Sequence, residues 1–138
     1  MISTLVDSNV LIDVLVAKQP WRDWSRATLR RAVDAGDVVI NQIVFAETAM
    51  HFEDTQDIED VFALVRPARE NIPWDAAQAA GRAHREYRRR GGLRERTLPD
   101  FLIGAHALVK GHRLLTRDPR RYREYFPAVD IIAPDTHP

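Results

Sequence analysis

The chain of 138 residues contains no cysteine, no long apolar run and no basic leader at its N-terminus. Without thiols it can form neither a disulfide framework nor a zinc site built on thiolates. No window approaches the roughly 20 apolar residues that a membrane-spanning helix needs. The first residues, MISTLVDSN, lack the basic start and apolar core of a secretory signal. We therefore expect a cytoplasmic protein that does not enter a membrane.

The composition is that of an ordinary globular protein. Hydrophobic residues make up 45% of the chain and charged residues 29%, a balance that argues against disorder. The length suits one domain with one core, and the sequence contains no internal repeat and no linker rich in Gly or Ser. We expect a single domain over residues 1–134, followed by a loose tail at residues 135–138.

The formal net charge is zero, but the charges are unevenly distributed. Residues 53–60, EDTQDIED, carry five acidic residues and no basic residue. Residues 82–96, RAHREYRRRGGLRER, carry seven Arg against two Glu. A basic strip of this density can neutralise the phosphates of a nucleic acid. It can equally be the solvated face of a helix, and the local pattern does not decide between the two.

Short apolar segments alternate with longer helical ones along the chain. Strands are predicted at residues 2–6, 37–40, 113–116 and 129–132, where β-branched and other apolar residues cluster. Helices are predicted over the following segments: 8–17, 20–36, from Asn41, from the acidic stretch to Pro67, from Pro73 to Gly91, and from Pro99 to Gly111. This alternation predicts an α/β fold with a parallel sheet and helices on both faces. The carboxyl ends of its strands share one edge, where such folds bind ligands.

Four acidic residues lie beside apolar sequence instead of in solvated stretches. They are Asp7, Glu47, Asp100 and Asp118. Each alone has a structural explanation, as a helix cap, a turn former or the partner of an Arg. Gathered at one sheet edge they would repel one another, and such clusters persist when a divalent cation neutralises them. Hard oxygen ligands favour Mg²⁺ or Mn²⁺, and Asn9 and Thr116 add neutral oxygens that can support the site.

A carboxylate–Mg²⁺ site usually acts on phosphate esters, with one or two ions activating water for in-line attack. The basic strip would then hold a polyanionic substrate, with Arg85, Arg88 and Arg89 as candidate contacts. Three further arginines flank the fourth acidic residue: Arg117, Arg120 and Arg121. They can fork onto phosphate oxygens, as Arg117 is expected to do, or anchor acidic side chains.

Four short motifs occur in an order and spacing that resembles the PIN-domain nucleases, specifically the VapC-type toxins of bacterial type II toxin–antitoxin pairs. They are DSNVLI from Asp7, FAET around Glu47, PDFLIGAHAL around Asp100 and TRDP around Asp118. The resemblance implies a three-layer α/β/α sandwich with a central parallel sheet. It also implies that these four acids bind Mg²⁺ or Mn²⁺, and that Asn9 and Thr116 support them.

Proteins of this family cut RNA, usually as homodimers, and are inhibited by a cognate VapB-type antitoxin. The resemblance therefore implies a metal-dependent endoribonuclease that acts as the toxin of such a pair. The alternative is a catalytically silent PIN-fold module that binds RNA or protein, although a decayed site would not need to keep Glu47 and Asp118.

Other phosphate-handling classes fit less well. A haloacid-dehalogenase-like phosphatase needs a second Asp two residues after the first, where this chain has Asn9. A response-regulator receiver needs an Asp after a middle strand, but the strand at 37–40 is followed by Asn41. No P-loop motif occurs in the chain.

Overall fold

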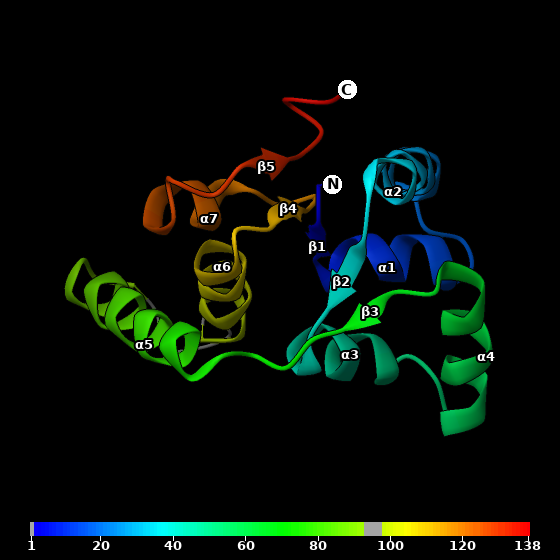
Figure 1. Cartoon of the computed structure of the whole chain (residues 1–138), viewed down its shortest axis with the longest axis horizontal. Coiled ribbons are helices and arrows are strands. Elements are labelled where there is room, and N and C mark those ends of the chain that lie inside the picture. Colours follow the sequence, from blue (N-terminus) through cyan, green and yellow to red (C-terminus); the bar gives the residue numbers. More distant parts are fainter. Residues whose placement is uncertain (1, 93–97) are drawn as a thin grey trace.

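The computed structural model describes residues 2–92 and 98–138. Helices and strands alternate along the chain, as Figure 1 shows. Their bounds in chain order are β1 (Thr4–Val6), α1 (Ser8–Leu15), α2 (Arg22–Ala35), β2 (Val38–Ile40), α3 (Gln42–Ala49), α4 (Thr55–Val65), β3 (Ala68–Arg69), α5 (Trp74–Arg89), α6 (Leu98–Lys110), β4 (Arg113–Leu115), α7 (Arg120–Tyr125) and β5 (Ile131–Ile132).

The strands form one parallel sheet in the order β3-β2-β1-β4-β5. Strand β1 is central, and Leu5 is paired with Val39 on one side and with Leu114 on the other. Helices α1 and α2 cover one face of the sheet, while α3 and α6 cover the other and α5 packs outside α6 (Figure 1). The predicted three-layer α/β/α sandwich with a parallel sheet is confirmed.

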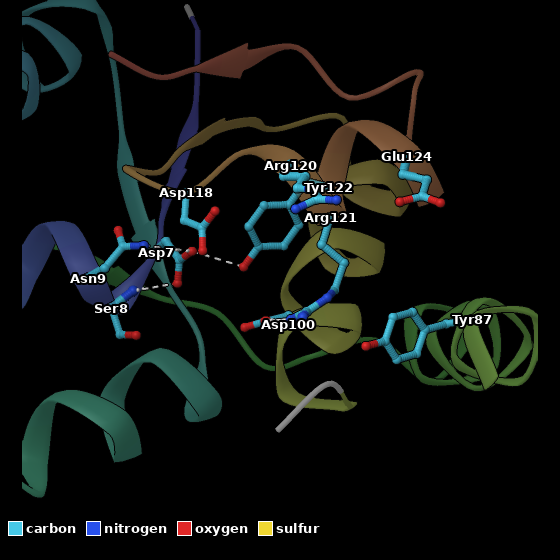
Figure 2. A pocket seen from close by; sticks show the side chains of 10 residues that line it. All are labelled: Asp7, Ser8, Asn9, Tyr87, Asp100, Asp118, Arg120, Arg121, Tyr122 and Glu124. Carbon is cyan, nitrogen blue, oxygen red and sulfur yellow. Dashed lines mark hydrogen bonds and ion pairs between the residues drawn. The ribbon is translucent and has the colours of Figure 1, made fainter. Parts of the chain in front are cut away.

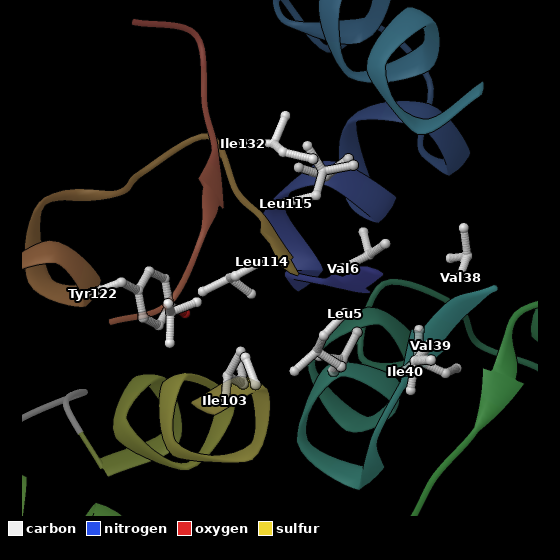
Figure 3. Packing of buried hydrophobic residues seen from close by; sticks show 14 of the residues in the cluster. Leu5, Val6, Val38, Val39, Ile40, Ile103, Leu114, Leu115, Tyr122 and Ile132 are labelled. Carbon is white, nitrogen blue, oxygen red and sulfur yellow. The ribbon is translucent and has the colours of Figure 1, made fainter. Parts of the chain in front are cut away.

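The core lies on both faces of the sheet because its central strands carry consecutive buried apolar residues, as in Leu5-Val6 and Leu114-Leu115. Leu5 and Val6 are consecutive, fully buried and point to opposite faces, as the strand repeat requires (Figure 3). Leu5 points toward the layer of α6, where Ile103 and Phe101 are also fully buried. This packing fixes the end of β1 and the start of α1 relative to α6.

The sequence pattern missed two short elements. Strand β3 has two residues, Ala68 and Arg69, both exposed at the edge of the sheet, so no buried apolar pattern indicates it. Helix α7 has six residues, most of them polar, and follows Asp118-Pro119, a pair typical of a break in regular structure. This omission matters because α7 contributes to the site described below.

The C-terminal residues make two contacts with helices. Arg123 forms an ion pair with Asp135 at 2.5 Å, and the indole nitrogen of Trp24 donates to the carbonyl of His137 at 2.7 Å. These contacts join the tail to α7 and α2. Within residues 2–92 and 98–138, none of the helices has the length and apolarity needed to cross a membrane.

Two glycines provide a matched test of the packing. A Cβ at Gly36, between α2 and β2, would lie 2.1 Å from the carbonyl oxygen of Ile2, so we expect Gly36→Ala to lower the free energy of unfolding by about 2 kcal/mol. A Cβ at Gly81, inside α5, would meet nothing within 4 Å, and Gly81→Ala should stabilise the protein by about 0.5–1 kcal/mol. Urea unfolding measures both. Equal stability of the two variants would contradict the close approach at Gly36.

Candidate functional site

Asp7 lies at the point where β1 ends and α1 begins. It is the N-cap of α1, and its Oδ1 accepts a hydrogen bond from the backbone nitrogen of Ser8 at 2.8 Å. Its own backbone nitrogen donates to the carbonyl of Leu115, the last residue of β4, at 2.9 Å. The side chain is only 5% exposed. Asp7 therefore serves as a helix cap and is also held at the carboxyl edge of the two central strands.

The second oxygen of Asp7 joins two further elements. Oδ2 accepts hydrogen bonds from the hydroxyls of Thr116, which follows β4, and Tyr122, in α7, each at 2.9 Å. Both partners are buried. Figure 2 shows the phenol of Tyr122 pointing toward Asp7 from α7. Strands β1 and β4 and helix α7 thus meet at one carboxylate.

Asn9 and Thr116 form a polar network around Asp7. The amide nitrogen of Asn9 donates to Thr116 Oγ1 at 3.3 Å, and its oxygen accepts from the backbone nitrogen of Arg117 at 3.2 Å. Thr116 Oγ1 also accepts from the backbone nitrogen of Asp118 at 3.1 Å. The hydroxyl thus donates once and accepts twice, which fixes the orientation of Asp7 and of the turn that carries Asp118.

The structure brings the other three predicted acids to the same region. Asp100 and Asp118 line a cavity of about 480 Å³ together with Asp7. Glu47, on α3, is joined to this cavity because its Oε1 accepts from the hydroxyl of Ser8, a lining residue, at 3.1 Å. Asp118 is exposed on its turn. Asp100 lies within the first turn of α6 and is therefore not the N-cap of that helix.

The electrostatics of the cavity show that these acids influence one another. Burial, and to a lesser degree the charge of Asp118, raises the pKa of Asp7, and the hydrogen bonds from Thr116, Tyr122 and Ser8 oppose that rise. Burial and the charge of Asp7 also raise the pKa of Glu47. The same two causes raise the pKa of Asp100 to about 6, although the Arg121 guanidinium opposes them. A protonated or cation-bound state of the pocket is thereby favoured.

The carboxylates of the cavity are oxygen ligands of the kind that a divalent cation takes. The partners of this buried carboxylate are neutral: a backbone amide, two hydroxyls and a carboxamide. In the described part of the chain, Asp100 is the only one of the four acids in an ion pair, with Arg121 at 2.5 Å. Several carboxylates with little positive compensation provide the hard oxygen donors that Mg²⁺ and Mn²⁺ prefer.

Tyr122 is a site residue that the sequence did not reveal. A tyrosine in the segment RRYREYF is typical of packing at the end of the sheet, and the burial of Tyr122 agrees with that role. Burial, together with the charges of Asp7 and Asp100, raises the pKa of Tyr122 well above its usual value. The phenol therefore remains a hydrogen-bond donor to Asp7. Only the position of α7 next to the pocket distinguishes it from an ordinary core tyrosine.

Arg117, expected to contact substrate, is engaged elsewhere. Its Nε and Nη2 donate to the two oxygens of Asp13 at 2.7 and 3.0 Å, and the hydroxyl of Ser25 donates to Asp13 at 2.7 Å. Asp13 is fully buried. The guanidinium therefore joins the turn after β4 to α1 and α2. Of the two roles considered for this arginine, phosphate contact and anchoring of an acidic side chain, the structure shows the second.

The basic strip forms an exposed face of α5. Arg85, Arg88 and Arg89 are exposed and line a shallow cavity of about 370 Å³. Tyr87, on the same helix, lines the acidic cavity (Figure 2), so α5 borders both. Two other arginines of the strip, Arg94 and Arg96, lie outside the described residues.

A separate cluster joins β3, α6 and β4. Glu70 Oε1 accepts from the Nε2 atoms of His106 and His112 at 2.7 and 2.8 Å, and these three ligand-type atoms all lie within 4.8 Å of one another. His106 is on the same helix as Asp100, but it bonds Glu70 and does not line the acidic cavity. The sequence spacing of the two histidines gives no helical pair that could have indicated this cluster.

The hydrogen bonds of this cluster determine the tautomer of His106. Asn41 Oδ1 accepts from the backbone nitrogen of Val44, as the cap of α3, so its amide nitrogen faces His106 Nδ1 at 3.0 Å. His106 Nδ1 must then accept, and its Nε2 carries the proton that bonds Glu70. A metal at Nε2 would move the proton of His106 to Nδ1. The Asn41 amide would then have to turn its oxygen toward His106, and this oxygen would no longer cap α3. We therefore interpret the cluster as a hydrogen-bonded structural link.

A parallel α/β/α sandwich with carboxylates gathered at the carboxyl ends of its central strands defines the class of this protein. The sequence profile of the PIN domain matches residues 4–127, and the chain belongs to the PIN domain family. Comparison with curated proteins gives no match.

Solved structures of toxin–antitoxin complexes share this fold. A chain of VapBC2 from Rickettsia felis, bound to a promoter DNA fragment, is 17% identical with a TM-score of 0.73, covering 96% of this chain and 98% of that one. A chain of DNA-bound VapBC from Salmonella typhimurium is 20% identical with a TM-score of 0.71 and the same coverage. A chain of a toxin–antitoxin complex from Klebsiella pneumoniae is 23% identical with a TM-score of 0.64, covering 94% and 95%.

The raised pKa of Asp100 predicts a pH-dependent gain in stability on substitution. Its folded pKa of about 6 exceeds the ordinary 3.8, so the folded state holds the proton more tightly. The ionised carboxylate therefore lowers the free energy of unfolding by its full amount above pH 6 and has no such effect below about pH 4. A pKa difference of about two units corresponds to almost 3 kcal/mol of unfolding free energy. Solvent screening reduces this to about 1–2 kcal/mol because the side chain of Asp100 is 32% exposed.

We therefore expect Asp100→Asn, compared with the wild type, to gain about 1–2 kcal/mol more stability at pH 8 than at pH 4. Urea unfolding in EDTA at the two pH values measures this difference. Asp34→Asn, on the exposed surface of α2, is the control for losing one acidic charge. An equal effect of Asp100→Asn at both pH values would contradict the raised pKa.

Proposed function

We propose that this protein is a divalent-metal-dependent endoribonuclease and the toxin of a VapC-type toxin–antitoxin pair. The observation that carries the proposal is the acidic cavity. A buried aspartate at the end of the central strand shares it with Asp100 and Asp118, and Glu47 joins through Ser8. Membership of the PIN domain family supports the same conclusion.

Asp7 and Asp100 would be the principal ligands of Mg²⁺ or Mn²⁺, and Glu47 and Asp118 would complete the set for one or two ions. The bound metal would polarise the scissile phosphodiester and activate water for in-line attack. Thr116 and Tyr122 hold one oxygen of Asp7, and the backbone nitrogen of Ser8 holds the other. Such hydrogen bonds keep a ligand oriented before the metal arrives.

RNA would be held along α5. The exposed Arg85, Arg88 and Arg89 form a positive face that a phosphate backbone can follow, and Tyr87 links this helix to the acidic cavity. A strand bound on this face is therefore directed toward the carboxylates. Arg117 contributes indirectly, by fixing the turn that carries Asp118 through its ion pair with Asp13.

The protein partner would be a VapB-type antitoxin, with a homodimer as the expected assembly of the toxin. Support comes from the named structures, which are VapBC and other toxin–antitoxin complexes. Large apolar side chains at the surface, such as Trp74 at 88% exposure and Met50 at 75%, provide area for protein contacts.

Cleavage of labelled RNA by the purified protein tests the reaction. We expect cutting in Mn²⁺ or Mg²⁺, none in EDTA, and a fall of about 100-fold or more in Asp7→Asn and Asp100→Asn because each loses a charged ligand. Asp75→Asn, exposed at the start of α5 and outside the cavity lining, should cut like the wild type. RNA that the wild type binds but never cuts would instead support the catalytically silent module.

Replacing Arg85, Arg88 and Arg89 together with Ala tests the RNA-binding face. Binding should weaken, and the slope of log K against log salt should become shallower by about 0.7 for each lost phosphate contact on single-stranded RNA. Fluorescence anisotropy at several salt concentrations measures both quantities.

The matched control removes the same charge from another exposed helical surface. It replaces three arginines of α2 with Ala: Arg26, Arg30 and Arg31. If the two triple variants lose affinity equally, the effect is one of net charge and the α5 face has no specific role.

A further inference from the structure

We propose that Arg121 is the phosphate-binding residue of the acidic cavity, and that its bond to Asp100 makes it compete with the divalent cation. This inference rests on the proposed nuclease function and assigns a role to an arginine that is anchored inside that site by an ion pair. The evidence for it is the position of the guanidinium in the cavity and its contacts with Asp100 and Tyr87.

Arg121 extends from α7 into the cavity, where it meets the first turn of α6. Its Nη1 donates to Asp100 Oδ2 at 2.5 Å, and its guanidinium carbon lies 5.4 Å from the centre of the Tyr87 ring. Figure 2 shows the side chain reaching from α7 to Asp100, with Tyr87 of α5 beside it. The side chain is 37% exposed, so the guanidinium is fixed but accessible.

Neighbouring arginines of the same segment are placed differently. Arg117 uses two donors on the buried Asp13, and Arg123 is paired with Asp135 in the C-terminal tail. Arg120 lines the cavity but is itself exposed. Arg121 therefore combines a place in the cavity with an anchor on a predicted metal ligand.

A guanidinium has five N–H donors in a planar fork, so its bond to Asp100 leaves donors for an anion. Acids surround the cavity, and a phosphodiester entering it would be repelled without a cation close by. Arg121 would supply that charge next to Asp100 and bind a phosphate oxygen of the RNA.

The same contact has an opposite effect on metal binding. The guanidinium already neutralises part of the charge of Asp100 and occupies its Oδ2, so a divalent ion gains less from that carboxylate. Removing Arg121 should therefore strengthen metal binding while it weakens phosphate binding. A residue that only maintains the structure would not shift these two affinities in opposite directions.

Arg121→Gln and Arg121→Lys in the full chain test the proposal. Calorimetric titration with Mn²⁺ should show about 3- to 10-fold tighter binding for Arg121→Gln and near wild-type binding for Arg121→Lys, which keeps the charge. A cleavage-resistant 2′-O-methyl tetranucleotide, too short to follow the α5 face, reports on the phosphate contact.

We expect the affinity for the tetranucleotide to fall about 10- to 100-fold in Arg121→Gln. In Arg121→Lys it should fall by a smaller factor, because lysine keeps the charge but lacks the planar fork of N–H donors. Arg123→Gln removes a nearby arginine outside the cavity and should change neither affinity. Circular dichroism and thermal unfolding establish that every variant is folded.

Unchanged tetranucleotide affinity in a folded Arg121→Gln variant, or no measurable affinity in the wild type, overturns the phosphate role. Unchanged or weaker Mn²⁺ binding in that variant overturns the competition. Failure of the nuclease proposal looks different: the wild type then cuts no RNA, whatever the two binding experiments show.

Discussion

The arrangement of this site depends on one buried carboxylate. Asp7 ends the central strand, caps the following helix and accepts hydrogen bonds from Thr116 and Tyr122. These contacts join β1, α1, β4 and α7 at one point. Because the charge is almost fully removed from water while its partners are neutral, the folded protein keeps an unfavourable group in place. Such a cost is typical of a position kept for its chemistry.

The fold could be predicted from the sequence because its strong signals are local. Asp7 after an apolar strand and Asn41 before an apolar helix each combine a backbone preference with burial, and both are helix N-caps in the structure. Strand β3 and helix α7 lacked such a pattern: one is an exposed two-residue edge and the other is short and polar. Only tertiary packing determines them.

The candidate site was predictable only in part. The four acids stand out because charged residues seldom interrupt apolar segments, and the structure places them around or beside one cavity. Tyr122 could not be found in this way, since a tyrosine in RRYREYF is usually a packing residue, and for Arg121 the sequence left phosphate contact and anchoring open. Their contacts with Asp7 and Asp100 depend on where α7 lies, which the pattern did not reveal.

The ion pair between Asp13 and Arg117 has a consequence for how this chain can change. A fully buried carboxylate that loses its cation is left uncompensated, at a typical cost of 3–5 kcal/mol, whereas an apolar pair of similar volume can be neutral. Divergence at these two positions should therefore proceed by joint exchange, with single intermediates disfavoured. Their identities would be inherited as a unit, even though they are 104 residues apart along the polypeptide.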